Sequence, residues 1–452
     1  MPPSPPTCVE REGSRFVRVT SPAEILQTLI RFDTTNPPGN EAECVRWVDQ
    51  VLRGAGLDTT LVGAVPARQN LVTRVAGRGE APALLVHGHV DVVPTRGQPW
   101  SVPPFEGRIV DGVLWGRGAL DMKGAVAVIL ATVLRLQREG VRPPGDLVVA
   151  ITADEEAGSD YGAGYLVREH PELLHGVAHA VGEGGGQSAE IAGRRLYPIA
   201  IAEKRVCWMR ATVRGPAGHG SSPVFGGAMA KLRQLLEALD SRWLPVHVTE
   251  PARLQVEATA GALPDPPASQ LRCLLDPAAT DSTLVELGDE GRRFGPILHH
   301  TVSATMLRGS EKVNVIPSEV LVDLDGRLLP GYRSSDLLGE LEQRLAGVEV
   351  DLEVMRTEEP GKPASMEGWE RLAAVLRELD PEGTPVPSVT AGFTDGCQFS
   401  KLGIQNYGCL PARFPAGFLG ERLVHAADER IPVSALDFGA EALHRIVTRF
   451  RL

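Results

Sequence analysis

The stretch Ala83-Leu84-Leu85-Val86-His87-Gly88-His89-Val90-Asp91-Val92-Val93-Pro94 decides how the rest of the chain is interpreted. It begins as an uninterrupted apolar run, which is typical of a strand buried on both faces. It then ends in polar side chains, and open α/β sheets bind ligands at the carboxyl ends of their strands. His89 and Asp91 stand two residues apart, so they point to the same side of an extended backbone. This pair suits a metal-ligating histidine steadied by a carboxylate, but a solvated strand end explains it equally well.

Length and composition narrow the class of protein. A chain of 452 residues exceeds one ordinary hydrophobic core and predicts two domains. The formal net charge of −11, without any basic block, argues against a nucleic-acid partner. No apolar run reaches the roughly 18 residues that a membrane helix needs, and the N-terminus lacks a signal-peptide pattern. Six cysteines without C-x-x-C spacing favour a reducing compartment. We therefore expect a cytoplasmic protein with no membrane partner.

The order of strand and helix patterns predicts the fold class. Apolar strand patterns alternate with helical patterns in the first part of the chain, which indicates crossover connections and a mostly parallel sheet. The strands are expected at 70–76, 82–90, 146–152 and 177–181, and the helices at 22–30, 41–55 and 124–138. A second pattern of half-buried strands and helices begins near Ile199 and contains a long irregular, Pro-rich section at 241–310. Half-buried elements of this kind are typical of an antiparallel α+β layer.

The first pattern returns towards the C-terminus. Helices are expected at 369–379 and 433–450, with a strand at 405–410 between them. The sequence therefore predicts an α/β domain with a mostly parallel mixed sheet, divided into the segments 15–202 and 359–452. An inserted α+β domain at 203–358 separates the two segments.

Five places near predicted strand ends offer metal ligands. They are His89, Asp121 in a Gly-rich loop, the pair Glu155-Glu156, Glu183 and His425. Imidazole and carboxylate ligands suit zinc, with cobalt or manganese possible. Five ligands exceed what one catalytic zinc takes, but two metals that share a carboxylate fit the count. One member of the Glu155-Glu156 pair is then left over as a general base for an attacking water.

Each of these residues also has a plain structural explanation. Asp121 suits an ordinary turn, and the acidic pair suits the N-terminus of a helix, where the dipole favours negative charge. Glu183 precedes three glycines that are typical of a flexible loop, and a lone His425 is typical of a surface. Their joint position beside buried strands favours the metal site over five separate coincidences.

Four motifs carry a resemblance to a known family. They are His87–Pro94, Trp115–Gly124, Thr152-Ala153-Asp154-Glu155-Glu156-Ala157-Gly158-Ser159 and Gly218-His219-Gly220-Ser221-Ser222-Pro223. Together they resemble the metallopeptidases that include acetylornithine deacetylase, succinyl-diaminopimelate desuccinylase, aminoacylase-1, carboxypeptidase S and the bacterial glutamate carboxypeptidase. The resemblance covers about residues 20–450. It implies a zinc-hydrolase catalytic domain with an inserted lid and dimerisation domain, and hence a possible homodimer.

The resemblance also implies a role for each matched residue. His89 and Glu183 would bind one metal, Glu156 and His425 the other, and Asp121 both. Asp91 would orient His89, and Glu155 would be the general base. His219 would stabilise the oxyanion, in many members within the site of the neighbouring subunit. The substrate contacts would be Asn314 and Arg327, which hold a free carboxylate, and the backbone of Gly392.

We therefore predict a co-catalytic zinc hydrolase that cleaves an amide or peptide bond in N-acyl amino acids or short peptides with a free carboxylate. A dipeptidase that needs a free amine and a non-catalytic metal-binding relative are the alternatives. A dinuclear phosphoesterase is disfavoured because the motifs contain few basic residues.

Two departures from the family pattern stand out. Cys397 replaces an arginine that many members carry after Thr394-Asp395. The section 241–310 is longer than in the small deacetylases, and its Trp243, Leu244 and Leu263 could shape a pocket for an apolar group.

Overall fold

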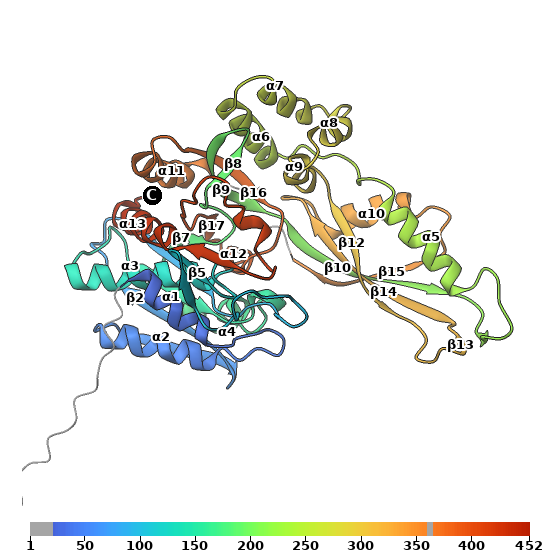
Figure 1. Ribbon diagram of the computed structural model, residues 1–452, viewed down its shortest axis with the longest axis horizontal. Coiled ribbons are helices and arrows are strands. Elements are labelled where there is room, and N and C mark those ends of the chain that lie inside the picture. Colours follow the sequence, from blue (N-terminus) through green and yellow to red (C-terminus); the bar gives the residue numbers. More distant parts are fainter. Residues whose placement is uncertain (1–20, 359–364) are drawn as a thin grey trace, which may run out of the picture.

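The computed structural model describes residues 21–358 and 365–452. The chain forms a broad main lobe around a nine-stranded sheet and a narrow lobe around a four-stranded sheet that extends away from it (Figure 1). Two of the predicted segments begin at residues 15 and 359, which lie outside the described residues. The division into 15–202, 203–358 and 359–452 therefore stays a prediction.

The main sheet has the strand order β1-β2-β6-β3-β7-β17-β9-β16, with β8 paired to β9. Strands β6, β3, β7 and β17 run parallel to one another, as do β9 and β16. The predicted α/β class with a mostly parallel central sheet is confirmed. The strands are β1 (Thr59–Val65), β2 (Arg68–Val75), β3 (Ala83–His89), β6 (Leu147–Thr152), β7 (Val177–Gly182), β8 (Ala189–Ile191), β9 (Arg194–Glu203), β16 (Thr384–Thr390) and β17 (Gln405–Gly408).

Helices cover both faces of this sheet, which explains the apolar run in β3. Leu84 and Val86 belong to one core and Leu85 to the other, because successive side chains of a strand point to opposite faces. On one face lie α1 (Pro22–Arg31), α2 (Ala42–Gly54), α3 (Lys123–Glu139), α11 (Met366–Leu379) and α13 (Val433–Arg449). On the other face lie α4 (Ala163–Glu169) and α12 (Asp395–Ser400). A small sheet of β4 (Arg108–Val110), β5 (Val113–Trp115) and β18 (Arg430–Pro432) joins this lobe.

The narrow lobe, called the lid below, is an antiparallel sheet with helices on one face. Its strand order is β12-β14-β10-β15, and α5 and α10 pack into the same core. A two-stranded ribbon of β11 and β13 stands at its far tip (Figure 1). The elements are β10 (Arg205–Arg214), β11 (Gly218–His219), α5 (Ala228–Asp240), β12 (Thr301–Arg308), β13 (Val315–Ile316), β14 (Glu319–Leu328), α10 (Ser334–Arg344) and β15 (Asp351–Thr357).

The prediction of an irregular section at 241–310 is wrong. It contains α6 (Glu250–Ala262), α7 (Pro267–Arg272), α8 (Thr280–Leu287) and α9 (Gly291–Leu298), called the helical segment below. Helices α6 and α7 carry proline in the first turn, where the missing N–H costs no helical hydrogen bond. The helical segment packs on the main lobe, where α6 contacts β16 and β9.

The apolar side chains expected to shape a pocket have other positions. Trp243 stacks on His299, with ring centroids 5.0 Å apart. Leu244 belongs to the lid core and Leu263 to the core of the helical segment. None of the three lines the main cavity.

Two further sequence expectations concern the cellular compartment, namely unpaired cysteines and the lack of a membrane helix. The five cysteines within the described ranges are all free, and Cys8 lies outside those ranges. Among the helices of residues 21–358 and 365–452, none is long and apolar enough to cross a membrane. The cytoplasmic location stays a prediction.

Candidate active site

The side chains predicted to bind metal meet at one edge of the main sheet. Three of the segments that supply them follow the ends of β3, β6 and β7, and the other two are loops before α3 and β18. Parallel strands present their carboxyl ends at the same edge, which brings these segments together. The six side chains at this edge are His89, Asp121, Glu155, Glu156, Glu183 and His425.

The first group of ligand atoms surrounds His89. Its Nε2 lies 3.4 Å from Oδ1 of Asp121 and 3.5 Å from Oε2 of Glu183. The other ring nitrogen, Nδ1, lies 3.0 Å from the backbone oxygen of Asp91, which places the ring proton on Nδ1. The lone pair of the fully buried Nε2 therefore faces the two carboxylates.

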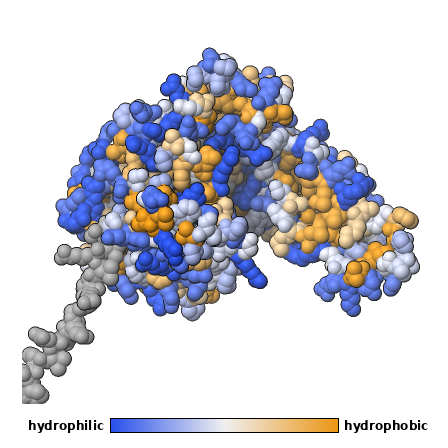
Figure 2. All heavy atoms as spheres, viewed as in Figure 1, coloured by the Kyte–Doolittle hydropathy of each residue, from blue (hydrophilic) through white to orange (hydrophobic). Residues whose placement is uncertain are grey.

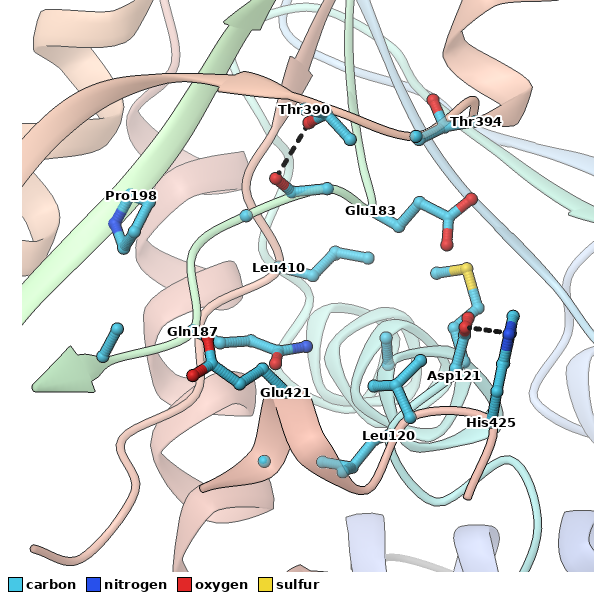
Figure 3. Close-up of a pocket in the computed structure, with 18 of the residues that line it drawn as sticks. Leu120, Asp121, Glu183, Gln187, Pro198, Thr390, Thr394, Leu410, Glu421 and His425 are labelled. Atoms are coloured by element: carbon cyan, nitrogen blue, oxygen red, sulfur yellow. Dashed lines mark hydrogen bonds and ion pairs between the residues drawn. The ribbon is translucent and has the colours of Figure 1, made fainter. Parts of the chain in front are cut away.

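The second group surrounds His425. Its Nε2 lies 3.1 Å from Oδ2 of Asp121 and 3.2 Å from Oε2 of Glu156. The two oxygens of Asp121 thus face different histidines. Figure 3 shows Asp121 and His425 on one side of the cavity and Glu183 nearby. These two carboxylates raise the pKa of His425 to about 10.

The donor set fits two divalent cations. Nε2 of His89, Oε1 of Glu156 and Oε1 of Glu183 are buried and have no hydrogen-bond partner among the described residues. Such atoms are rare in folded proteins, and one cation in each group would satisfy all three. The ligand atoms of each group lie within 4.8 Å of one another. Imidazole with carboxylates suits zinc, cobalt or manganese.

Glu155 lies beside both groups without belonging to either. Its Oε2 is 3.8 Å from Nε2 of His89, and its side chain is 10% exposed. Burial, and then the neighbouring carboxylate of Glu183, raise the pKa of Glu155 well above its usual range. A raised pKa makes the ionised carboxylate a stronger base, which is the property that a general base requires.

Asp91 holds the histidine and the acidic pair in one arrangement. Its carboxylate oxygens accept the backbone N–H groups of Glu155 and Glu156, both at 3.1 Å. Oδ1 also lies 3.3 Å from Nδ1 of His89. The carboxylate is fully buried, so these contacts act in a medium of low polarity.

A buried network supports the residue before Glu155. Asp154 has a left-handed backbone with φ of 67°, which is uncommon for an aspartate. Its Oδ1 lies 2.9 Å from Nη2 of Arg68 and accepts Nδ2 of Asn36 at 3.1 Å. Arg68 also pairs with Glu41 at 2.6 Å, and Asn36 donates to Asp91 at 2.9 Å.

Glu429 joins the loops that carry Asp121 and His425. Its carboxylate accepts the backbone N–H groups of Leu120 at 2.7 Å, Asp121 at 3.0 Å and Gly118 at 3.1 Å. It also pairs with Nη1 of Arg117 at 2.6 Å.

The same arginine reaches the second loop. Nη2 of Arg117 donates to the backbone oxygen of His425 at 3.3 Å, and Gln98 donates to the same oxygen at 2.8 Å. Glu429 and Arg117 therefore connect both metal-facing loops.

A third group of possible ligands lies in the lid. It contains His247, His300 and Glu340. Nδ1 of His300 accepts the backbone N–H of Leu329 at 3.1 Å, so the ring proton of a neutral His300 lies on Nε2. A protonated nitrogen cannot ligate a metal. This group is therefore better explained as a polar cluster, in which His247 also contacts Tyr332.

The predicted substrate-binding residues divide into two sets. Arg327 and Gly392 line the cavity beside the two ligand groups. Arg327 is paired at two points with Asp325, at 2.7 and 3.0 Å, so part of its fork is already engaged.

His219 and Asn314 do not line that cavity. They lie side by side in the ribbon at the tip of the lid, far from the main lobe (Figure 1). Both side chains are exposed there.

Many family members carry an arginine where this chain has Cys397. Here an arginine from another strand contacts that position. Arg205, at the start of β10, directs Nη1 to Sγ of Cys397 at 2.6 Å and Nη2 to Ser400 at 3.2 Å. A guanidinium thus stands next to position 397 although it comes from a distant part of the chain. Burial raises the pKa of the Cys397 thiol.

The cavity itself has a volume of about 1150 Å³. Figure 3 shows Glu183, Asp121 and His425 in one part of it, and Leu410, Leu120, Gln187 and Glu421 further along. Lid residues Arg327 and Arg356 contribute basic side chains to the same cavity.

Comparison with known proteins agrees with this architecture. The family model described as peptidase family M20/M25/M40 matches residues 85–449. The chain belongs to this peptidase family. As a member of the M20 family it is a hydrolase that acts on amide or peptide bonds.

Individual relatives of this M20 chain show moderate sequence identity to it. Aminoacylase-1 of Sus scrofa is 26% identical over 365 residues, which cover 78% of each chain. The N-fatty-acyl-amino acid synthase/hydrolase PM20D1 of Mus musculus is 26% identical over 370 residues, covering 79% of this chain and 72% of the relative. The metallo-carboxypeptidase Sso-CP2 of Sulfolobus solfataricus shares the fold with a TM-score of 0.72 at 17% identity, covering 94% of this chain and 97% of that one.

The residues that sequence reasoning missed are those that hold the ligands. Glu429 lies four positions after the predicted ligand His425, and its acidic type was the available signal. Arg68, Asn36 and Arg117 had no comparable signal, because their partners are distant in the sequence.

We expect Glu429→Gln to weaken metal binding by about 10–100-fold, as loss of a residue that orients metal ligands does. The amide offers one acceptor oxygen where three N–H groups and Arg117 need partners. Metal content after dialysis against a weak chelator measures the effect. Glu237→Gln, whose side chain on α5 is 70% exposed, is the control. Equal metal content in both variants would contradict the assignment.

We expect Arg68→Met to lower the free energy of unfolding by about 3–5 kcal/mol, because it leaves the buried Glu41 and Asp154 unpaired. Arg53→Met removes a pair whose arginine side chain is 52% exposed and should cost under about 1 kcal/mol. Urea denaturation compares the two variants. Losses of equal size would show that the Arg68 network does not support the turn before Glu155.

Proposed function

We propose that this chain is a two-zinc hydrolase that removes the acyl group from N-acyl amino acids with a free carboxylate. The observation that carries the proposal is Asp121, whose two oxygens face His89 and His425 within separate ligand groups. Glu183 and Glu156 complete the two groups. The similarity to aminoacylase-1 supports N-acyl amino acids over other amides.

The chemistry divides between cations and protein. When bound, two divalent cations polarise the scissile carbonyl and lower the pKa of water. Glu155 takes a proton from the attacking water and later gives it to the leaving nitrogen, which its raised pKa permits. Asp91 keeps the Glu155 backbone and the His89 ring in place during both transfers.

The lid supplies the contacts for the substrate's carboxylate. Arg327 keeps N–H groups on the side away from Asp325, and a guanidinium holds a carboxylate through paired hydrogen bonds. Arg356, which lines the same cavity, adds positive charge although it also contacts Gly158 and Asp160.

We expect Glu155→Gln to lower kcat by about 10²–10⁴-fold, the usual contribution of a general base, while the protein still binds two metal ions. Hydrolysis of N-acyl amino acids, dipeptides and their carboxamides, before and after chelation, measures the activity. Near-full turnover by the variant would contradict the role of Glu155. Faster hydrolysis of free dipeptides than of N-acyl amino acids would favour the dipeptidase alternative.

We also propose that the active unit is a homodimer formed through the lid, in which His219 and Asn314 enter the partner's cavity. Two observations support this. Both residues lie outside the cavity of their own chain. The lid also exposes large apolar side chains, among them Phe225 at 94% and Met306 at 56%. Figure 2 shows apolar surface gathered on this lobe. Exposed apolar patches of this kind are typical of interaction sites.

Mixing two inactive variants tests that arrangement. Glu155→Gln and His219→Ala should each be inactive, and an equal mixture that has exchanged subunits should regain about a quarter of the wild-type activity. Half of the dimers are then mixed, and each mixed dimer has one site with an intact Glu155 and an intact partner His219. Light scattering establishes the dimer. Absence of any recovery after demonstrated exchange would place His219 outside the partner's site.

A further inference from the structure

The part of the cavity beyond the proposed metal ligands is lined by apolar side chains, unlike the two ligand groups. Leu120 and Leu410 extend into it past Glu183 and Asp121 (Figure 3). Phe414, Phe418 and Leu419 also line it, and the first two rings pack with centroids 4.8 Å apart. We call this region the apolar chamber.

The cavity is larger than the sites that usually bind small molecules. Sites for small molecules occupy about 300–1,000 Å³, and this cavity measures about 1150 Å³. An acetyl group at the metal ligands would leave most of the chamber unfilled. A longer apolar group would remove the leucine and phenylalanine side chains from water, which is favourable in proportion to the area buried.

Charged side chains line the cavity as well, among them Arg195, Arg293 and Glu421. Glu421 stands beside Gln187 in Figure 3 and pairs with Arg293 of α9. Arg422 and Asp289 form a second contact between the same two segments, at 3.8 Å. The helical segment therefore holds the loop that carries the chamber's aromatic wall.

The apolar chamber is an unfavourable environment for the free amine of a dipeptide. Such an amine sits on the carbon next to the scissile carbonyl, where Leu410 and Leu120 extend into the cavity (Figure 3). Glu421 is already paired with Arg293, and Glu190 is exposed to solvent on the edge strand β8. A buried ammonium without a partner is costly, whereas an apolar acyl chain is not.

We infer that the apolar chamber is the acyl subsite and that it selects N-acyl amino acids with extended apolar acyl chains. The inference rests on the proposed function and adds the class of acyl group. In this arrangement the carboxylate of the substrate faces Arg327 of the lid, and the acyl chain runs past Leu410 towards Gln187. The ion pair of Arg293 and Glu421 closes the far end.

A series of acyl chains on one accepted amino acid tests the inference. From N-acetyl through N-hexanoyl to N-decanoyl, kcat/KM should rise up to about four-fold for each methylene that is fully buried. Inhibition of the wild-type enzyme by acetate, hexanoate and decanoate should follow the same order. A flat or falling series of kcat/KM would overturn the chamber as acyl subsite, whatever the order of inhibition by the free acids.

A matched pair of substitutions tests where in the cavity the acyl chain binds. Ala189 lines the cavity from β8, and Ala189→Phe should reduce the ratio of decanoyl to acetyl kcat/KM at least ten-fold. Val285→Phe adds a similar ring on α8, where Val285 is 81% exposed and does not line the cavity, and should leave the ratio unchanged. Equal ratios in the two variants would overturn the placement of the chain.

The outcomes separate the inference from the function on which it rests. Equal hydrolysis of acetyl and decanoyl substrates contradicts the chamber and leaves the amide hydrolase intact. Failure to hydrolyse any N-acyl amino acid, together with metal-dependent hydrolysis of dipeptides, contradicts the proposed function. Inhibition by the free acids then shows whether the chamber binds apolar chains at all.

Discussion

The arrangement of the proposed metal ligands depends on a buried carboxylate that belongs to neither ligand group. Glu429 accepts three backbone N–H groups of the loop before α3 and pairs with Arg117, which in turn reaches the backbone of His425. Gly118 in this loop has a φ of 87°, a conformation that favours glycine. Without the carboxylate, several backbone N–H groups would be buried unpaired, and the loop would lose the shape that directs Asp121 between two histidines.

Asp91 plays the corresponding part on the other side of the site. It holds the Glu155-Glu156 turn through two backbone N–H groups while its neighbour His89 faces the carboxylates. Burial, and then the neighbouring carboxylates, raise the pKa of Glu155 well above its usual range and that of Glu183 to about 7. The protein maintains this concentration of charge through Arg68, Arg117 and the hydrogen bonds of the backbone. Divalent cations would relieve the remaining repulsion, so binding of the proposed metals would also stabilise the fold at this edge of the sheet.

In the proposed function, the lid and the helical segment contact different parts of the substrate. The lid contributes Arg327 and Arg356 to the cavity and carries His219 away from it, at a tip suited to reach a second copy. The helical segment packs on the main sheet and holds the loop of Phe414 and Phe418 by ion pairs. In the proposed arrangement, separate elements recognise the carboxylate and the acyl chain, so the acyl preference would be free to change without disturbing the proposed metal ligands.

The sequence by itself determined the elements and the chemistry that lie within short stretches. The apolar run of β3 and the ligand motifs depend on neighbours a few residues apart, so periodicity and motif reading find them. Only the tertiary structure decided the rest. Glu429 and Leu120 are 309 positions apart, and Arg205 reaches Cys397 from 192 positions away. The cavity wall comes from loops whose sequences show no common pattern. Contacts over such separations depend on how the strands are ordered in the sheet, and that order is set by the packing of the whole chain.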